Sequence, residues 1–212
     1  MYTPVDTENW NRKRAFEFFR PFEDPFFNVT VQMDVTALVE TCKTHGLSFA
    51  AACLYFSQES ANEIREFRIR LFGDQLVEFD RVEATQTILQ DDESFSFCYL
   101  PWQPDLASYS ESARASVMKY KEKRTFDVET ERVDLIYYSV LPWLAFTSFK
   151  HATKQDPFQT VPRIAFGKYG ETSGRTSIPL SVEVNHMIMD GIHVGKYVDL
   201  FQEKLNSCAG AL

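Results

Sequence analysis

Hydrophobic and polar residues alternate in several short stretches of the chain. Residues 29–33 alternate between apolar and polar side chains, which is the period of a strand with one buried face. Two similar runs, 68–71 and 75–78, flank Gly73-Asp74 and predict a β-hairpin. Further strands are predicted at 85–90, 94–100, 135–140, 145–149, 163–169 and 177–184. We therefore expect a sheet built from many short strands.

Other stretches follow the period of a helix. Residues 35–45 form one such stretch closed by Gly46, and Ser48 is the predicted N-cap of a mostly apolar helix that runs to about Ile64. Residues 106–123 predict a long, polar, exposed helix. The last helix is marked by Val194, Val198, Phe201 and Leu205, and a short amphipathic helix near the start by Trp10, Phe16, Phe18 and Phe19 among Arg12, Lys13 and Arg14. Hairpin strands mixed with several helices predict an α+β sandwich around a mixed sheet.

The composition fits one folded unit. The chain has 212 residues without a low-complexity linker or a repeat, so we expect a single domain over residues 1–212. A hydrophobic fraction of 44% favours a substantial core, and a net charge of −8 argues against a general nucleic-acid binder. No apolar run approaches the roughly 20 residues of a membrane span. The first residues lack the apolar core of a signal peptide, so a cytoplasmic protein is predicted.

The candidate chemistry lies in residues 179–197, PLSVEVNHMIMDGIHVGKY. An alternating stretch ends at His186, Asp190-Gly191 follows four residues later, and the pattern then becomes helical. A histidine at the end of a strand can be held rigidly enough to act as a general base. Each residue alone has an ordinary explanation, a core histidine bonded to a carbonyl or an aspartate N-cap. Their combination, followed by glycine, favours a functional site.

Several other kinds of site are not indicated. The chain has no GxSxG, GxGxxG, GxxxxGK[ST] or HExxH motif. The cysteines, Cys42, Cys53, Cys98 and Cys208, contain no CxxC pair, so we predict buried free thiols and no metal site. Of the remaining histidines, His193 is predicted on a helix face, His45 in a loop and His151 in solvent. The sequence thus predicts His186 as a general base in a reaction without metal or covalent intermediate.

The segment NHMIMDGIH resembles the active-site signature of the type A chloramphenicol acetyltransferases, His-His-x-x-x-Asp-Gly-x-His. Three further blocks resemble that family in the family's order: NWNRKRAFEFF at 9–19, DESFSF at 92–97 and YYSVLPWLAFTSF at 137–149. Together the matches extend from about residue 9 to residue 207. They are more specific than His-x-x-x-Asp-Gly alone, which also occurs in the dihydrolipoamide acyltransferases. The resemblance implies the two-layer sandwich of the CoA-dependent acyltransferases.

The resemblance also implies a reaction, the acetyl-CoA-dependent O-acetylation of the chloramphenicol hydroxyl, which confers antibiotic resistance. His186 would take the proton from this hydroxyl, which would attack the thioester directly in a ternary complex. Ser139 would donate to the oxyanion of the tetrahedral intermediate, where charge develops only in the transition state. Asp190 would form a structural ion pair with Arg12 and so hold the turn after His186. Its carboxylate would pair with the arginine rather than with the histidine.

Members of that family are homotrimers with active sites at the subunit interfaces. The base comes from one subunit and much of the acceptor pocket from its neighbour. The resemblance implies that aromatic side chains line the acceptor pocket, here Phe18, Phe19, Phe27, Phe95 and Phe126.

Three positions depart from the family pattern. Asn185 replaces the first histidine of the signature, Phe19 replaces a pocket tyrosine, and Ala165 replaces a threonine that helps to hold a water beside the oxyanion. Two alternatives therefore stay open: an acyl-CoA O-acyltransferase with a different small hydroxyl acceptor, or a catalytically inactive relative that sequesters hydrophobic ligands. The presence of both His186 and Ser139 argues against the inactive relative.

Overall fold

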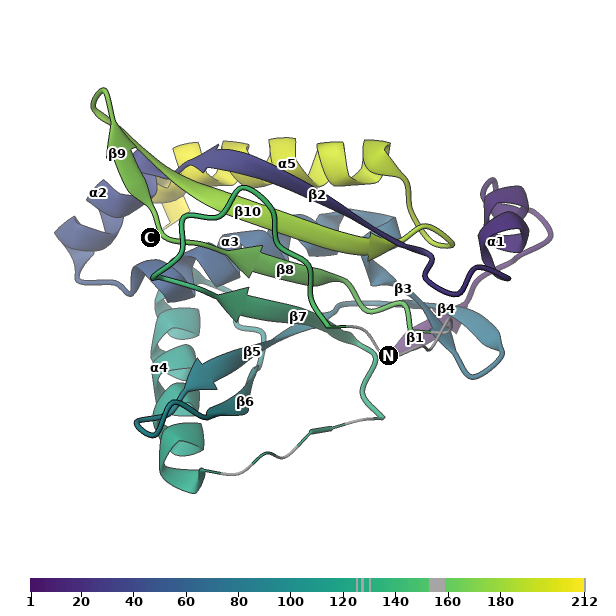
Figure 1. The fold of residues 1–212 in the computed structure, drawn as a ribbon, viewed down its shortest axis with the longest axis horizontal. Coiled ribbons are helices and arrows are strands. Elements are labelled where there is room, and N and C mark those ends of the chain that lie inside the picture. The colour runs from purple at the N-terminus through teal and green to yellow at the C-terminus, as the bar shows by residue number, and fades with distance from the viewer. Residues whose placement is uncertain (125, 127, 130, 153–158, 212) are drawn as a thin grey trace.

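The computed structural model describes residues 1–124, 126, 128–129, 131–152 and 159–211, which form a layer of helices packed on a mixed sheet (Figure 1). The larger sheet has seven strands in the order β2-β10-β8-β7-β5-β6, with β9 paired to β10. Strand β7 runs parallel to β5 and β8, and the other pairs are antiparallel. The α+β class with a mixed sheet is confirmed.

The strands are short except for β2 and β10. The strands of the larger sheet are β2 (Phe26–Asp34), β5 (Glu83–Leu89), β6 (Phe95–Leu100), β7 (Leu135–Val140), β8 (Arg163–Phe166), β9 (Gly170–Thr172) and β10 (Arg175–Asn185). A smaller antiparallel sheet contains β1 (Tyr2–Pro4), β3 (Ile69–Phe72) and β4 (Gln75–Phe79). The predicted hairpin around Gly73 is confirmed, and its left-handed backbone (φ 61°) suits a residue without a side chain.

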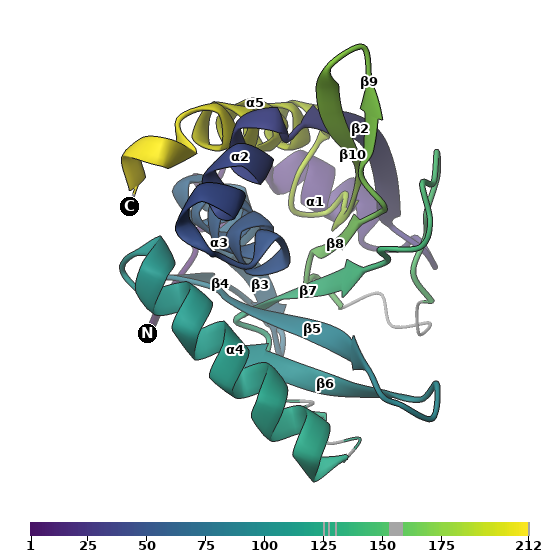
Figure 2. The same ribbon diagram turned by 90° about the vertical axis from the view of Figure 1, so that its left-hand side faces the viewer.

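Helices cover one face of the larger sheet, and the chain that follows β7 crosses the opposite face (Figure 2). The helices are α1 (Lys13–Phe19), α2 (Thr36–His45), α3 (Phe49–Glu63), α4 (Leu106–Lys123) and α5 (Gly191–Asn206), with short 3-10 turns η1 (Arg65–Arg68) and η2 (Cys208–Ala211). The predicted caps are present, because the Ser48 hydroxyl accepts from the Ala51 N–H and Gly46 ends α2 in a left-handed conformation. Helix α3 is buried over most of its surface, as its apolar sequence predicts.

The predicted strand at 145–149 is wrong. Residues 145–149 contain no strand and instead cross the sheet face that the helices leave uncovered. The strands that this segment crosses, β7, β8 and β10, already have a neighbour on each side. None of the three has a free edge, so residues 145–149 cannot extend the sheet there.

Strand β8 ends at Phe166, earlier than the predicted Tyr169, and the chain is crowded at the next residue, Gly167. A Cβ atom built on Gly167 would lie 2.6 Å from the Leu144 carbonyl oxygen and 2.9 Å from the Phe146 ring. Glycine therefore allows the segment after β7 to fold closely against the sheet. The adjacent N–H of Lys168 donates to the Leu144 carbonyl at 2.7 Å and secures this approach.

The core contains two buried polar arrangements. The Ser57 hydroxyl lies 2.9 Å from the Tyr138 hydroxyl and 2.6 Å from the Tyr197 hydroxyl, linking α3 to β7 and α5. The Arg70 guanidinium is fully buried and donates to main-chain carbonyls that include those of Val133 and Leu135.

The four cysteines are free and buried, as predicted. Among the helices of the described residues, none is long and apolar enough to cross a membrane.

Candidate active site

His186 follows the last residue of β10 and is clamped between two aromatic rings. Strand β10 pairs with β2 up to Asn185, and the His186 N–H donates to the Pro25 carbonyl at 2.8 Å. The imidazole stacks on Phe19 at 4.2 Å between ring centroids and 7° between planes. The Phe27 ring lies on a tilt to the imidazole, with 4.4 Å between the ring centroids and 38° between the planes. The ring therefore has a fixed orientation, while 32% of the side chain stays exposed.

A buried arginine secures the turn that follows this histidine. Arg12 forms an ion pair with Asp190 through two guanidinium nitrogens, one of them 3.0 Å from Oδ1. The same guanidinium donates to the main-chain carbonyl of His186 at 3.0 Å. This pairing holds the pKa of the Asp190 carboxyl below its ordinary value, although partial burial acts in the opposite direction. Arg12 thus connects α1 to the turn at two points.

The Asp190 carboxylate also lies near the histidine ring. Oδ1 of Asp190 is 3.0 Å from Nδ1 of His186, but the approach is outside hydrogen-bond geometry. Nδ1 of His186 is buried and makes no hydrogen bond to any residue that the structure describes. The contact is therefore electrostatic, and the directional bonds of Asp190 go to Arg12. Because Nδ1 is buried, Nε2 is the nitrogen that a substrate could reach.

His193 caps the first turn of α5 and does not simply face outward. Its Nδ1 accepts a hydrogen bond from the Asp190 N–H at 2.8 Å. This tautomer carries its proton on Nε2, which lies 3.5 Å from a carboxylate oxygen of Glu66. The spacing of three residues between Asp190 and His193 is that of a capping box, and it could have indicated this role.

Ser139 lies in β7 on the sheet face that the helices leave uncovered. The neighbouring Tyr138 and Val140 point to the helical side, where Tyr138 bonds Ser57 and Val140 packs against the core. Ser139 pairs with Ala165 of β8, which in turn pairs with Ser181 of β10. The Ser139 hydroxyl lies 3.2 Å from Nε2 of His151.

The prediction that His151 is solvated is wrong. The side chain is half-buried, and burial lowers its pKa from 6.5 to about 4. Arg163 lowers this pKa further, whereas Glu183 opposes the shift. The imidazole is therefore neutral at physiological pH. Its position in an irregular segment gives no periodic pattern, so sequence spacing could not place it beside Ser139.

Ser139 and His186 of one chain lie far apart. Ser139 lies opposite Ser181 in the sheet register, two strands away. His186 follows Ser181 by five residues, directly after the end of β10. With about 4.8 Å between strands and about 3.3 Å per residue, their Cα atoms are roughly 19 Å apart. That distance is too large for both side chains to contact one reacting carbonyl.

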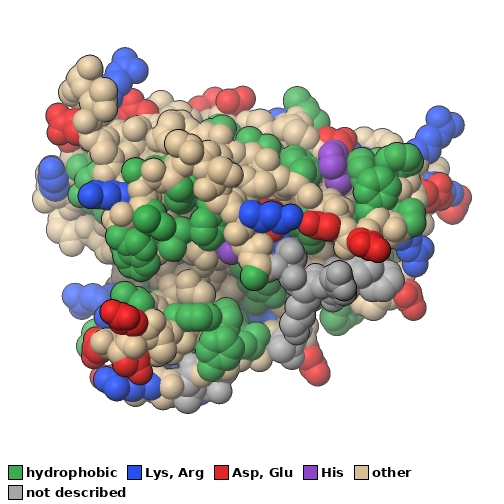
Figure 3. Space-filling view, in the orientation of Figure 1, with side chains coloured by type: hydrophobic (Ala, Val, Ile, Leu, Met, Phe, Trp, Pro, Cys, Tyr) green, Lys and Arg blue, Asp and Glu red, His purple; other side chains and the backbone are tan. Residues whose placement is uncertain are grey.

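The five candidate pocket phenylalanines form two groups. Phe19 and Phe27 contact His186, and Phe18 lies 5.0 Å from Phe19. Phe95 and Phe126 contact each other at 5.2 Å, and both contact Phe97. Phe18 and Phe126 are 62% and 61% exposed. Apolar side chains gather on this face beside α1 and near the β5–β6 end of the sheet, among other places (Figure 3).

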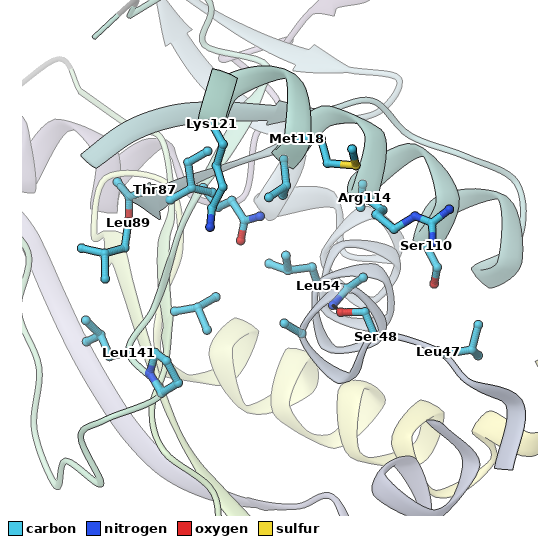
Figure 4. Close-up of a pocket in the computed structure, with 18 of the residues that line it drawn as sticks. Leu47, Ser48, Leu54, Thr87, Leu89, Ser110, Arg114, Met118, Lys121 and Leu141 are labelled. Carbon is cyan, nitrogen blue, oxygen red and sulfur yellow. Dashed lines mark hydrogen bonds between the residues drawn. The ribbon is translucent and has the colours of Figure 1, made fainter. Parts of the chain in front are cut away.

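A cavity of about 1210 Å³ lies between α3, α4, β5 and the end of β7 (Figure 4). Its lining is mainly apolar and includes Leu54, Met118 and Trp143. The charged residues in the lining are Arg114 and Lys121 from α4, with Glu93 and Glu111. A second cavity of about 400 Å³, which contains Lys168, shares lining residues with the first, Ala50, Val140 and Pro142. Among the described residues, no group of three or more His, Cys, Asp or Glu side chains is arranged to hold a metal ion.

Comparison with known proteins gives a consistent result along the chain. A family model described as chloramphenicol acetyltransferase matches residues 1–202. Chloramphenicol acetyltransferase 3 of Escherichia coli is 29% identical over 208 residues, which cover 97% of this chain and 98% of that protein. A chloramphenicol acetyltransferase of Proteus mirabilis is 28% identical over 200 residues, covering 94% of this chain and 92% of that protein.

Solved structures show the same similarity. One, titled chloramphenicol acetyltransferase, superposes with a TM-score of 0.86 at 26% identity and covers 97% of this chain and 100% of its own. The cubic core of the pyruvate dehydrogenase multienzyme complex superposes with a TM-score of 0.69 at 15% identity, covering 99% of this chain and 98% of its own. At 15% identity, the similarity to the pyruvate dehydrogenase core shows the fold alone. The predicted sandwich of the CoA-dependent acyltransferase type is confirmed.

Proposed function

Because the chain belongs to the chloramphenicol acetyltransferase family, we propose that it transfers the acetyl group of acetyl-CoA to a chloramphenicol hydroxyl and so confers resistance. The observation that carries the proposal is the family match over residues 1–202, which includes the histidine turn. Acetyl-CoA is the co-substrate, and no metal takes part in the proposed steps. We expect the protein to work in the cytoplasm, where acetyl-CoA is available.

We propose His186 as the general base of the reaction. Nε2 accepts the hydroxyl proton of chloramphenicol while the hydroxyl oxygen attacks the thioester carbonyl. The resulting tetrahedral intermediate collapses as the carbon–sulfur bond breaks, and His186 returns the proton to the CoA thiolate. A positioned base contributes about 10²–10⁴-fold in rate. Stacking on Phe19 and Phe27 supports this role because it fixes the ring before the substrate arrives.

Ser139 is the proposed donor to the oxyanion. Removing one such donor typically costs about 10²–10³-fold in kcat. The Arg12–Asp190 pair acts indirectly in this proposal, by fixing the turn and the carbonyl of His186.

Two copies of the chain are needed to complete one site in this mechanism. The separation of roughly 19 Å between Ser139 and His186 within a chain follows from the strand register. We therefore propose the homotrimer of the family, with His186 from one copy and Ser139 from its neighbour. The two separate phenylalanine groups support this arrangement, since an interface would bring the His186 group of one copy to the Phe95 and Phe126 group of another.

Acetyl-CoA fits the cavity beside α4 in our proposal. About 1210 Å³ is large for a small-molecule pocket, and CoA is a large ligand. Arg114, Lys121 and the nearby Lys168 would pair with its phosphates, and the apolar lining would hold the pantetheine arm. The cavity lies on the helical side of the sheet and the Ser139 hydroxyl on the other, so the pantetheine arm would pass the end of β7, where Leu141 and Pro142 line the cavity, to bring the thioester to the oxyanion donor.

A thiol-release assay tests the reaction. Purified protein should liberate free CoA thiol from acetyl-CoA only when chloramphenicol is present. His186→Ala should abolish turnover and keep the circular dichroism spectrum, whereas His45→Ala, at an exposed position at the end of α2, should leave turnover unchanged. Absence of thiol release by the unmodified protein would reject the proposed acceptor, and activity in His186→Ala would reject the base.

Complementation tests whether two copies share a site. His186→Ala and Ser139→Ala, each inactive or nearly so alone, are co-expressed with different tags and purified through both tags. In each mixed trimer, about one third of the interfaces would combine an intact His186 with an intact Ser139 if the contacts are heterologous. Activity should therefore return in the mixture. No recovery in verified mixed trimers would show that both residues act from the same copy.

A further inference from the structure

The hydroxyl of Ser139 has one side-chain hydrogen-bond partner among the described residues, His151. The bond joins Oγ of Ser139 to Nε2 of His151 at 3.2 Å. Ala165, the residue directly opposite Ser139 on β8, carries no polar side chain that could serve instead. The two residues are 12 positions apart in the chain, so the irregular segment after β7 folds back to form the contact.

The main chain next to His151 is tied to β10 at two points. The Ser181 hydroxyl donates to the Phe149 carbonyl at 3.0 Å, and the His151 N–H donates to Oε2 of Glu183 at 3.2 Å. Glu183 is fixed in turn by a buried ion pair with Arg163 at 2.7 Å. Residues 149–151 are thus held over the uncovered face of β10, two strands from Ser139.

Two further contacts orient the imidazole. The Phe149 ring meets it edge-on, with 4.8 Å between centroids and 89° between planes. Ala165 lies between Ser139 and Ser181 on the same sheet face, and its single methyl group leaves room for a ring that reaches from β10 towards β7. The imidazole is therefore positioned by the fold and does not depend on a substrate to reach Ser139.

The hydrogen-bonding state of the ring decides what it can do for Ser139. Nδ1 of His151 is buried and has no hydrogen-bond partner among the described residues. A proton on Nδ1 would be a buried donor without an acceptor, which is rarer in proteins than an unfilled acceptor. The neutral tautomer with its proton on Nε2 avoids that arrangement. Burial and Arg163, which lower the pKa of His151 to about 4 against the opposing Glu183, keep the ring neutral.

We propose that His151 is a positioning residue that donates from Nε2–H to the Ser139 oxygen and leaves the serine proton free for the substrate oxyanion. The donated bond fixes the side-chain rotamer of Ser139, because Oγ must remain within reach of the ring. It also polarises the serine O–H bond, since hydrogen bonds in a chain strengthen one another. The role for His151 rests on the proposed function of Ser139 as oxyanion donor.

Kinetics with a double-mutant cycle test the proposal. His151→Leu replaces the imidazole by an apolar side chain of similar length that cannot donate a hydrogen bond. It should lower kcat about tenfold, while KM for chloramphenicol changes less than about twofold. His151→Gln, which can donate from its amide, should recover most of the loss. In the Ser139→Ala background, His151→Leu should cause no further loss, because the group through which it acts is absent. Equal loss in both backgrounds, or failure of glutamine to recover activity, would overturn the proposal.

A second measurement does not depend on turnover. Long-range proton–nitrogen spectra of protein labelled with ¹⁵N-histidine distinguish the two neutral tautomers and the charged ring, and His151→Leu assigns the His151 signals. We expect a neutral ring with its proton on Nε2 between pH 6 and 8, and a changed Nε2 signal in Ser139→Ala. A proton on Nδ1, or a charged ring, would overturn the proposal. If the tautomer is as expected but the unmodified protein releases no thiol, the proposed reaction fails and the His151–Ser139 bond stands.

Discussion

Replacing Arg12 by alanine tests whether the Arg12–Asp190 pair holds the histidine turn. Arg12 is 7% exposed and bonds both the Asp190 carboxylate and the His186 carbonyl. Removing one partner of a buried ion pair costs about 3–5 kcal/mol, because the other charge is left unpaired. Asp190 is 41% exposed, so water solvates part of the freed charge and the expected loss falls to about 2–3 kcal/mol. Urea unfolding measures this loss directly.

The lost stability should depend on pH with a defined sign. In the folded protein the pKa of Asp190 is lowered, chiefly by its bond to Arg12. The pair therefore contributes stability above the unfolded pKa of aspartate, about 4, and the contribution disappears as the pH falls through the lower folded pKa. The difference in unfolding free energy between the unmodified protein and Arg12→Ala should be complete at pH 7 and shrink below about pH 4.

Activity should fall together with stability. A loosened turn displaces His186, and a displacement of about 1 Å can cost about 10²-fold in rate. Arg12→Lys keeps the charge but not the two-pronged geometry, so it should give intermediate values of kcat and stability. Arg14→Ala, at an exposed position in the same helix, is the matched control and should change neither. If Arg12→Ala behaves like Arg14→Ala, the pair does not hold the turn.

Four other predictions follow from the described contacts. Ser139→Ala should lower kcat about 10²–10³-fold with little change in KM, and a change confined to KM in the thiol-release assay would contradict its role. Ser57→Ala should destabilise the fold by about 1–3 kcal/mol in urea, because it leaves buried tyrosine hydroxyls unpaired, and adding Tyr138→Phe should recover part of the loss. Burial raises the pKa of the Cys42 thiol to about 11 and that of the Cys98 thiol to about 12. An aromatic disulfide reagent at pH 8 should therefore label both thiols slowly until the protein is unfolded. Fast labelling of the folded protein would contradict the burial. Sedimentation equilibrium should give a mass of three chains of 24.6 kDa, about 74 kDa, and a monomer active at nanomolar concentration would refute the shared site.

Local patterns in the sequence predict many individual elements. Strand β7 and helix α4 begin and end at the predicted residues, and Ser48 and Gly46 form the predicted caps. Such features depend on neighbouring residues, so the chain itself specifies them. The prediction failed at 145–149, because the strands that this segment crosses have no free edge. Whether an edge is free depends on the whole sheet and cannot be derived from one segment.

The candidate site shows the same division between local and distant information. His186 was recognisable because the strand, the turn and the helix that hold it are continuous in sequence. The contact between Arg12 and Asp190 joins residues 178 positions apart and was expected only from the resemblance to a family. The contact between His151 and Ser139 was not expected, because a loop histidine has no periodicity that indicates its direction. Packing of the whole chain determines both contacts.

The absence of a side chain at Gly167 has a consequence for mutational tolerance. Gly167 lines the second cavity, and the segment that begins with Leu144 and leads to His151 rests against it. A single methyl group would meet the Leu144 carbonyl at 2.6 Å, so this segment would have to move away from the sheet. The segment leads to His151, whose ring contacts the Ser139 hydroxyl, so the displacement would reach the proposed oxyanion donor. Gly167→Ala should therefore impair the action of Ser139 as well as the fold, although residue 167 itself makes no contact with Ser139.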